Sequence, residues 1–131
     1  MTDGPAQLGF VWPARGPITS VFGNDNGRWH PGLDIGILRS PSVRAAAPGV
    51  VAQVGTPVGY EGYGNVVLVR MAPGLEALYA HLSSWRVHVG ELVVADQPLG
   101  VAGCTGWCTG THLHFELREL GRPVDPLDFL G

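Results

Sequence analysis

Short apolar runs that end at glycine restrict most strongly what this chain can fold into. Glycine and proline number 20 and 11 among 131 residues, and both favour turns over helix interiors. No stretch of ten or more residues has an unambiguous helical period, so the runs are interpreted as strands. The length corresponds to one domain, residues 1–131, with an irregular lead-in at residues 1–11. The pattern predicts a mainly β fold.

The turn residues divide the chain into candidate strands. We expect strands at residues 17–22, 33–36, 49–54, 64–70, 87–90, 93–94 and 99–101. In the second of these, Leu33 and Ile35 should face inward while Asp34 faces the other way. Residues 65–69 are nearly all apolar, which predicts a central strand.

Three other segments have less regular patterns. Residues 76–82 suit a helix or a strand, and in a strand Tyr79 and His81 would share a face, where Tyr79 either packs in the core or lines a groove. Residues 24–27 are rich in Asn, Asp and Gly and are expected to form a turn. Near the end, Asp125 should cap a short helical turn that has proline at its first position.

Residues 110–116 contain three side chains that could bind a metal ion or take part in catalysis. Read as a strand, this run places His112, His114 and Glu116 on one face, and the apolar residues between them on the other. The two imidazoles are then about 6–7 Å apart at the backbone, close enough to reach one metal ion or one substrate. Glu116 either supports a ligand histidine from behind or has a solvated or structural role.

Charge and composition exclude several classes. The net charge is −3, which argues against nucleic acid, because nucleic-acid binding requires a basic surface. No apolar run approaches the length of a membrane span. Residues 1–10 contain neither a basic segment nor an apolar segment of a signal peptide. We therefore expect a chain that is cytosolic when made, or a mature domain that begins at its own Met.

The chain has five histidines: His30, His81, His88, His112 and His114. A catalytic zinc takes three protein ligands of the His, Asp or Glu type and keeps one position open. His30 and Asp34 offer two ligands, and His112 or His114 offers a third. The other imidazoles could move protons. His88 alternates with valines and is expected to be an exposed strand residue.

Three motifs, taken in order, resemble one family. They are His-Pro-Gly-Leu-Asp at residues 30–34, Tyr-Ala-His-Leu-Ser at 79–83 and Thr-Gly-Thr-His-Leu-His-Phe-Glu at 109–116. The chain is similar to the lysostaphin-type (LytM-like) zinc endopeptidases, which cleave the peptide part of bacterial peptidoglycan. The resemblance extends from residue 12 to residue 130. It implies a small antiparallel β-sheet domain of the hybrid-barrel type, with a loop-walled groove over a zinc site.

The resemblance also implies the roles of single residues. His30, Asp34 and His114 correspond to the zinc ligands. His112 corresponds to a catalytic histidine that contacts the metal-bound water or the substrate, and His81 corresponds to its partner. The sequence leaves open which of these two histidines is the general base.

The implied function is zinc-dependent hydrolysis of peptide bonds in the cross-links or stem peptides of peptidoglycan. The alternative is a non-catalytic relative that regulates another cell-wall hydrolase. We expect a monomer that acts at the bacterial cell wall, outside the cell or in the periplasm. A bacterial enzyme and a phage lysin are both compatible, and the bond could be a glycine bridge or a D-amino-acid cross-link. Glycine-rich walls at residues 23–27 and 103–110, with Trp29 and Trp107, suit a slim peptide.

The chain departs from the family pattern at a few positions. Asp25 stands where many members have arginine, and Thr111 stands where proline is frequent. The loop before the last motif contains Cys104 and Cys108 in place of small polar residues. These cysteines could be buried thiols or, in an oxidising compartment, a disulfide. A separate zinc site is disfavoured, because His-x-His is tighter than the spacing in structural zinc fingers.

Two other classes do not fit the residues. A cupin would need a glycine at position 126, where this chain has proline, and a second motif for which too few residues follow. A biotinyl or lipoyl carrier attaches its cofactor to lysine, and all eight basic residues of this chain are arginine.

Overall fold

The computed structural model describes residues 9–36, 40–108 and 110–130. All strand pairs in these ranges are antiparallel, and the described residues contain no α-helix. The strands are β1 (Ile18–Ser20), β2 (Gly23–Asp25), β3 (Arg28–His30), β4 (Leu33–Gly36), β5 (Ser42–Arg44), β6 (Gly49–Gly55), β7 (Asn65–Ala72), β8 (Leu75–Trp85), β9 (Leu92–Val93), β10 (Pro98–Ala102), β11 (His112–Glu119) and β12 (Arg122–Val124). The expected mainly β, antiparallel fold is confirmed. Most of the expected lead-in, residues 1–8, lies outside the described residues.

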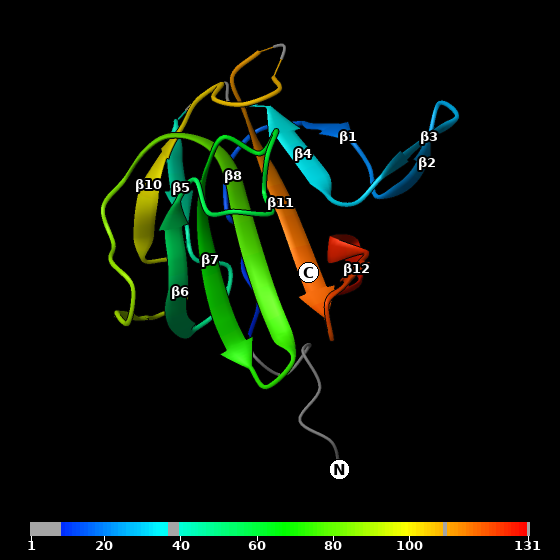
Figure 1. The fold of residues 1–131 in the computed structure, drawn as a ribbon. Helices are drawn as coiled ribbons and strands as arrows, with labels where there is room; N and C mark the ends of the chain where they lie inside the picture. Colours follow the sequence, from blue (N-terminus) through cyan, green and yellow to red (C-terminus); the bar gives the residue numbers. More distant parts are fainter. Residues whose placement is uncertain (1–8, 37–39, 109, 131) are drawn as a thin grey trace.

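Ten strands form one sheet, and β2 and β3 form a separate hairpin. The main order is β1-β4-β11-β8-β7-β6-β9, with β12 on β11 and with β10 pairing both β5 and β8 (Figure 1). The hairpin projects from one side of the molecule, next to β4 (Figure 1). Because β11 lies between β4 and β8, three segments distant in sequence meet at its polar face.

The alternation of β11 and β4 builds the core. Leu113 and Phe115 are fully buried on one face of β11, and Leu33 and Ile35 are fully buried on β4. They belong to a large apolar cluster, where Tyr79 packs on Phe115 with 5.2 Å between ring centroids. The expected inward direction of the two β4 residues is therefore confirmed.

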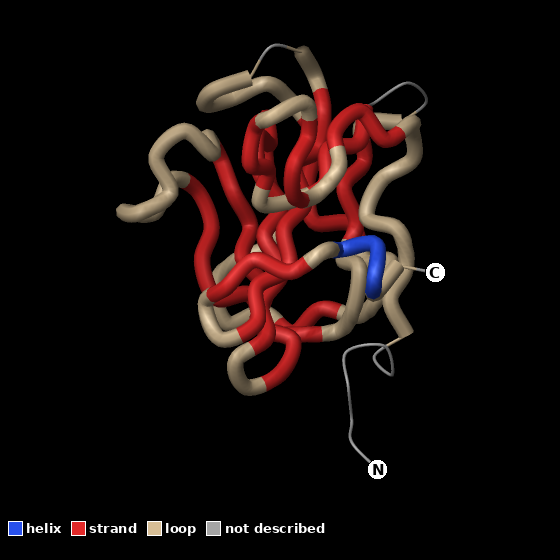
Figure 2. The backbone as a smooth tube through the Cα atoms, turned by 90° about the vertical axis from the view of Figure 1, so that its right-hand side faces the viewer, coloured by secondary structure: helices blue, strands red, loops and turns tan. Residues whose placement is uncertain are grey.

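The other face of β7 and β8 carries a smaller apolar cluster. It consists of Val66, Leu68, Leu78 and Ala80, and Tyr60 and Tyr63 pack on it from the loop before β7. The same loop supplies Tyr63 to the polar site described below. Figure 2 shows how the strands curl around the core while loops of considerable length connect their ends.

The ambiguous segment at residues 76–82 is a strand. It lies within β8, which pairs with β7, β10 and β11. The expected position of residues 65–69 inside the sheet is also found, since β7 lies between β6 and β8. Asp125 caps a 3-10 turn, η2 (Pro126–Asp128), and accepts a hydrogen bond from the Leu127 amide at 3.0 Å, as predicted.

Two of the expected strands differ from those in the structure. Residues 87–90 form a turn, where the amide of Glu91 donates to the carbonyl of His88 at 3.0 Å. His88 is an exposed turn residue and not a strand residue; its ring nitrogen lies 3.2 Å from the Glu91 carboxylate. The expected strand at residues 17–22 is shortened to β1.

The turn predicted at residues 24–27 is a complete β-hairpin. Asp25 pairs with Arg28, which leaves Asn26 and Gly27 as a two-residue connection with φ of 54° and 81°. An Asn-Gly pair with positive φ at both positions is the preferred connection of a tight hairpin. The hairpin places His30 at the end of β3.

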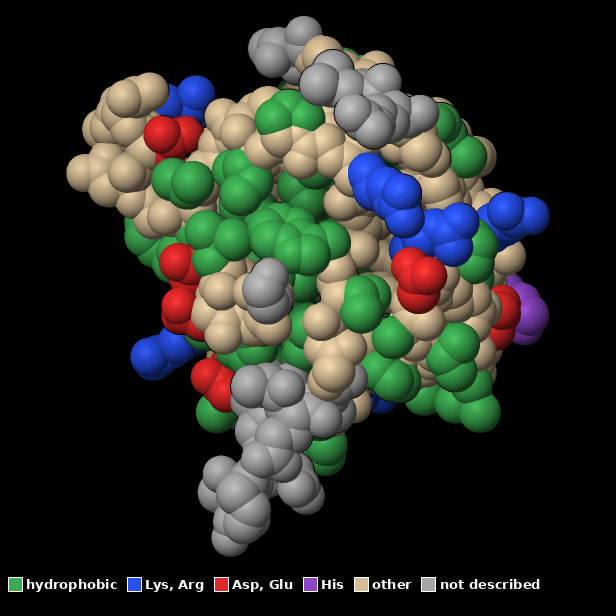
Figure 3. All heavy atoms as spheres, turned by 180° about the vertical axis from the view of Figure 1, so that it is seen from behind, with side chains coloured by type: hydrophobic (Ala, Val, Ile, Leu, Met, Phe, Trp, Pro, Cys, Tyr) green, Lys and Arg blue, Asp and Glu red, His purple; other side chains and the backbone are tan. Residues whose placement is uncertain are grey.

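No helix in the described ranges is long and apolar enough to span a membrane. The side of the molecule opposite to the view of Figure 1 exposes several groups of hydrophobic side chains, and histidine is visible there only at one edge (Figure 3).

Candidate metal centre

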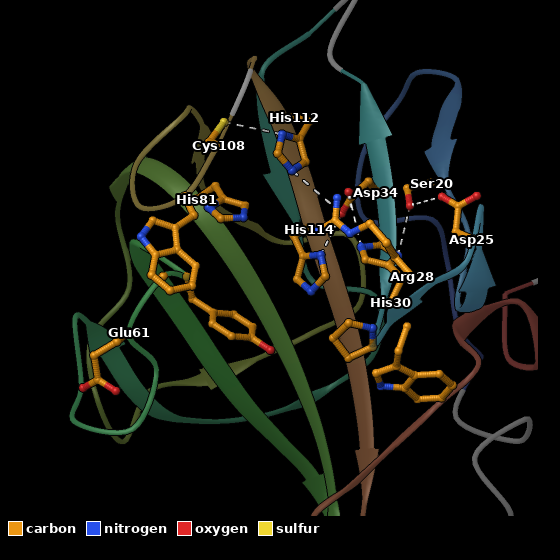
Figure 4. Close-up of a pocket in the computed structure, with 15 residues that line it drawn as sticks. Ser20, Asp25, Arg28, His30, Asp34, Glu61, His81, Cys108, His112 and His114 are labelled. Carbon is orange, nitrogen blue, oxygen red and sulfur yellow. Dashed lines mark hydrogen bonds and ion pairs between the residues drawn. The ribbon is translucent and has the colours of Figure 1, made fainter.

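The register of β11 and β4 brings two of the expected ligands together. His114 pairs directly with Asp34, so that their side chains lie next to each other on the polar face. His30 reaches the same point from the end of β3 (Figure 4). The ligand atoms of these three residues all lie within 4.8 Å of one another.

The distances in this group suit one small cation. His114 Nδ1 lies 2.7 Å from Asp34 Oδ1, and His30 Nε2 lies 3.3 Å from Asp34 Oδ2. Ligand atoms around a tetrahedral zinc ion are separated by roughly 3.3 Å, given bond lengths near 2 Å. Two imidazole nitrogens and one carboxylate oxygen are also the donor types of catalytic zinc sites that keep one position open. The residues therefore fit the metal in both spacing and chemistry.

Each of the two imidazoles is held by its other nitrogen. His30 Nδ1 lies 2.9 Å from the carbonyl of Val21 and 3.2 Å from the hydroxyl of Ser20. His114 Nε2 lies 2.9 Å from Glu116 Oε1. These contacts leave His30 Nε2 and His114 Nδ1 directed toward Asp34, the arrangement by which metal-ligating imidazoles are oriented in proteins.

Glu116 is fully buried directly behind His114. Besides His114, it accepts a hydrogen bond from the hydroxyl of Tyr63 at 2.5 Å and one from Arg118 Nε at 2.9 Å. Burial alone would raise the pKa of Glu116, but the hydrogen bonds from His114 and Tyr63 outweigh it and hold the pKa below its usual value. Glu116 is therefore not solvated, and it contacts the histidine that the resemblance assigns as a ligand.

The two carboxylates determine the protonation of the metal-free site. Burial alone would lower the pKa of His114, but hydrogen bonds to Asp34 and Glu116 raise it to about 9. Burial likewise would raise the pKa of Asp34, and its contacts with the imidazoles lower it. Without metal, His114 is therefore a cation at neutral pH, with Nδ1–H donated to Asp34 and Nε2–H donated to Glu116, both ionised.

Gly32 makes the close packing behind Asp34 possible, a role that the sequence pattern did not suggest. A Cβ atom there would lie 2.6 Å from the carbonyl oxygen of Phe115 and 3.0 Å from Cε1 of His114. Any side chain at position 32 would therefore displace β11 or the ligand imidazole.

His81 enters the site through a backbone irregularity. Tyr79 points into the core, and strict alternation would send His81 to the same side, as the sequence predicted. Instead, His81 has φ of 63°, and the pairing of β8 with β7 shifts register between Tyr79 and Leu82. The irregularity turns the imidazole toward the pocket and returns Leu82 to the core. The prediction that Tyr79 and His81 share a face was therefore wrong.

The rings of His81 and His112 lie next to each other in the pocket, with 4.9 Å between their centroids (Figure 4). His81 Nδ1 lies 2.6 Å from the carbonyl of Thr105, and His112 Nδ1 lies 2.8 Å from the carbonyl of Gly110. Because a carbonyl only accepts, both Nδ1 atoms are donors, and both Nε2 atoms remain available in the neutral rings. His112 Nε2 lies 3.8 Å from Asp34 Oδ1. Burial lowers the pKa of His81, which favours its neutral form.

These residues lie in a pocket of about 510 Å³. Trp29 and Arg28 line it on the side of the hairpin, and Trp107 and Glu61 line it on the opposite side. Both indoles are largely exposed, at 66% and 83%. The expected groove with loop walls is therefore present.

Cys104 and Cys108 form a disulfide, with 5.3 Å between their Cα atoms. Of the possibilities left open by the sequence, buried thiols are excluded by this bond. Cys108 also lines the pocket, and its sulfur lies 3.6 Å from His112 Nδ1.

Comparison with known proteins adds to this geometry. The family model described as "Peptidase family M23" matches residues 28–126. The DD-carboxypeptidase/endopeptidase Mpg of Neisseria meningitidis is 43% identical over 76% of this chain and 22% of its own length. The murein hydrolase activator NlpD of Escherichia coli is 33% identical over 91% of this chain and 30% of its own length. The chain thus spans less than a third of either curated relative.

A solved structure of a peptidase has the same fold. The catalytic domain of the antimicrobial peptidase lysostaphin from Staphylococcus simulans superposes with a TM-score of 0.69 and is 30% identical, covering 92% of this chain and 87% of that domain. The lysostaphin-type resemblance and its fold are therefore confirmed.

Proposed function

Because this chain belongs to peptidase family M23, we propose that it is a zinc-dependent endopeptidase that hydrolyses peptide bonds in the cross-links or stem peptides of peptidoglycan. One observation carries the proposal. The His30, Asp34 and His114 ligand group lies in the same pocket as two further imidazoles whose Nε2 atoms are available.

His30 Nε2, Asp34 and His114 Nδ1 would hold the zinc ion. Bound there, zinc would lower the pKa of a bound water toward about 7 and polarise the scissile carbonyl. Glu116 and the carbonyl of Val21 keep the two ligand imidazoles oriented.

His81 and His112 would transfer the proton and stabilise the negative charge that develops on the substrate oxygen. A neutral imidazole whose Nδ1 donates to a carbonyl can accept a proton at Nε2, deliver it to the leaving amine, or donate it to an oxyanion. The lowered pKa of His81 keeps its ring neutral near pH 7, so that Nε2 is free to accept a proton. His112 Nε2, which is 3.8 Å from the Asp34 carboxylate, would lie beside the ligand group as the second imidazole able to handle that proton.

The site favours an amide over a glycosidic bond. A glycosidase generally needs two carboxyl groups that face each other across the bond. Here Asp34 is engaged by both ligand imidazoles, and Glu116 is fully buried behind one of them. The substrate would therefore be the peptide part of the cell wall, and the place of action the periplasm or the cell surface. We expect the chain to act there as a monomer.

The likeness to NlpD favours a second candidate, a regulator that activates another cell-wall hydrolase. Such a regulator would not need turnover, although it could bind peptidoglycan in the same groove. The presence of the complete ligand group and of two oriented imidazoles supports the enzyme instead.

Digestion of purified sacculi tests the proposal. We expect new amino groups without new reducing ends, inhibition by a chelator, and recovery after zinc is added. Asp34→Ala should lose zinc, whereas His81→Ala and His112→Ala should retain it and lose hydrolysis by a factor on the order of 10² or more. His88→Ala is the matched control, since His88 is exposed outside the pocket, and it should be fully active.

Two results would contradict the enzyme. Zinc-loaded wild-type protein that releases no amino groups from any wall type, yet stimulates a second hydrolase, would favour the regulator. Reducing sugars released without amines would exclude peptide hydrolysis as the activity.

A further inference from the structure

The loop closed by the Cys104–Cys108 disulfide contacts both imidazoles outside the ligand group. The carbonyl of Thr105, inside the loop, accepts the hydrogen bond from His81 at 2.6 Å. Just beyond the loop, the carbonyl of Gly110 accepts the hydrogen bond from His112 at 2.8 Å. One short covalent ring therefore contains the carbonyl group that orients His81 and ends two residues before the carbonyl group that orients His112.

This loop is tied to β7 and β8 at Thr105 and to the segment before β7 at Trp107. The hydroxyl of Thr105 donates to the carbonyl of Leu82 at 2.8 Å and accepts from the amide of Asn65 at 3.0 Å. The amide of Trp107 donates to the carbonyl of Gly62 at 2.9 Å. The disulfide extends this attachment to Cys108, two residues before the Gly110 carbonyl that holds His112.

The ligand group is held by other parts of the chain. The second nitrogen of His30 contacts Val21 and Ser20, and the second nitrogen of His114 contacts Glu116. A change in the disulfide loop should therefore reach His112 and His81 before it reaches the metal ligands.

We propose that the Cys104–Cys108 disulfide is a positioning device for His112, so that hydrolysis depends on its oxidised state while zinc binding does not. This inference rests on the proposed function. Reduction by a phosphine would break the sulfur–sulfur bond and give two thiols, with one water supplying both protons and the oxygen of the phosphine oxide. Cys104 is exposed, which gives the reductant access to the bond. The freed segment could then rotate the Gly110 carbonyl away from His112.

The experiment compares three forms of the full chain with zinc bound: the oxidised wild type, the wild type reduced with tris(2-carboxyethyl)phosphine, and the double variant Cys104→Ser/Cys108→Ser. Zinc per chain, kcat and KM are measured on a soluble cross-linked peptide. Long-range ¹H–¹⁵N spectra of the histidine rings report the tautomers, with His81→Gln and His112→Gln used to assign the signals. The double variant with added phosphine controls for effects of the reductant itself.

Reduction and the double variant should each leave one zinc per chain and lower kcat by roughly 10- to 100-fold, the effect expected when a catalytic group is misplaced by about 1 Å. KM should change little. The Nδ1–H signal of His112 should give way to a mixture of tautomers, while the rings of His30 and His114 stay unchanged.

Full reduction with unchanged kcat and unchanged His112 tautomer would overturn the inference, as would loss of zinc on reduction. If the oxidised, zinc-loaded protein hydrolyses nothing, the proposed function fails, and the tautomer spectra alone then decide the positioning role. The reduced wild type keeps the test valid if the double variant does not fold.

Discussion

Glu116→Gln should weaken both the fold and the metal site while keeping the shape of the side chain. In the native protein, Oε1 accepts from His114 and Tyr63, and Oε2 accepts from Arg118. The amide nitrogen of glutamine cannot accept, so at least one of these three donors loses its partner in either amide orientation. A hydrogen bond to a charged group contributes about 1.5–3 kcal/mol, and Arg118 also loses its buried counter-charge. We expect the free energy of unfolding to fall by about 2–4 kcal/mol.

The same change should lower zinc affinity by roughly 10- to 100-fold, the usual effect of removing the partner that orients a metal-ligating histidine. Thermal unfolding of the metal-free protein and competition with a chromophoric chelator measure the two effects separately. Glu119→Gln is the matched control, because Glu119 is exposed at the end of the same strand and should change stability by less than about 0.5 kcal/mol. Zinc affinity of Glu116→Gln within twofold of the wild type would refute the reasoning.

Three further changes have defined outcomes. Gly32→Ala should lower the free energy of unfolding, measured in urea, by about 1–3 kcal/mol and weaken zinc binding, because the added Cβ would lie 2.6 Å from a backbone oxygen. An unchanged free energy of unfolding would argue against this contact. Zinc must displace a proton from His114, whose pKa is raised to about 9. As the pH increases, the apparent zinc affinity should therefore rise about tenfold per pH unit up to pH 9 and level off above it, and calorimetry at pH 7 should detect one proton released per zinc. A zinc affinity that does not change with pH would contradict the assignment of His114 as a ligand. Reducing Cys104–Cys108 should lower the free energy of unfolding by about 2 kcal/mol, as expected for a loop this short, and an unchanged urea midpoint would exclude that contribution.

Much of the polar face could be predicted because a strand alternates strictly. The period of two placed His112, His114 and Glu116 on one side of β11, and the structure has them there. The partner strand could not be derived in this way. His114 and Asp34 are 80 residues apart; the ligand needs of zinc suggested that Asp34 meets His112 or His114, and only the resemblance to a family selected His114.

The failures occur where the backbone leaves its regular geometry. His81 faces the pocket only because its φ is positive, and alternation alone assigns it to the core. The sequence pattern suggested no role for Gly32, yet glycine is required there by the packing of β11 against it. The hairpin at Asn26 and Gly27 could have been recognised, since an Asn-Gly pair between short strands is a strong hairpin signal.

The charges around His114 indicate how the fold tolerates the metal-free state. Asp34 and Glu116 are both ionised, and Arg118 together with the proton on His114 balances them. The strand that carries the site is anchored separately, through Phe115 and its apolar neighbours in the core. On the proposed function, zinc would replace the proton and leave the site with about one excess positive charge, which suits an oxyanion. Metal removal should therefore abolish turnover while the sheet persists, because the proton on His114, together with Arg118, can balance the two carboxylates but cannot activate water.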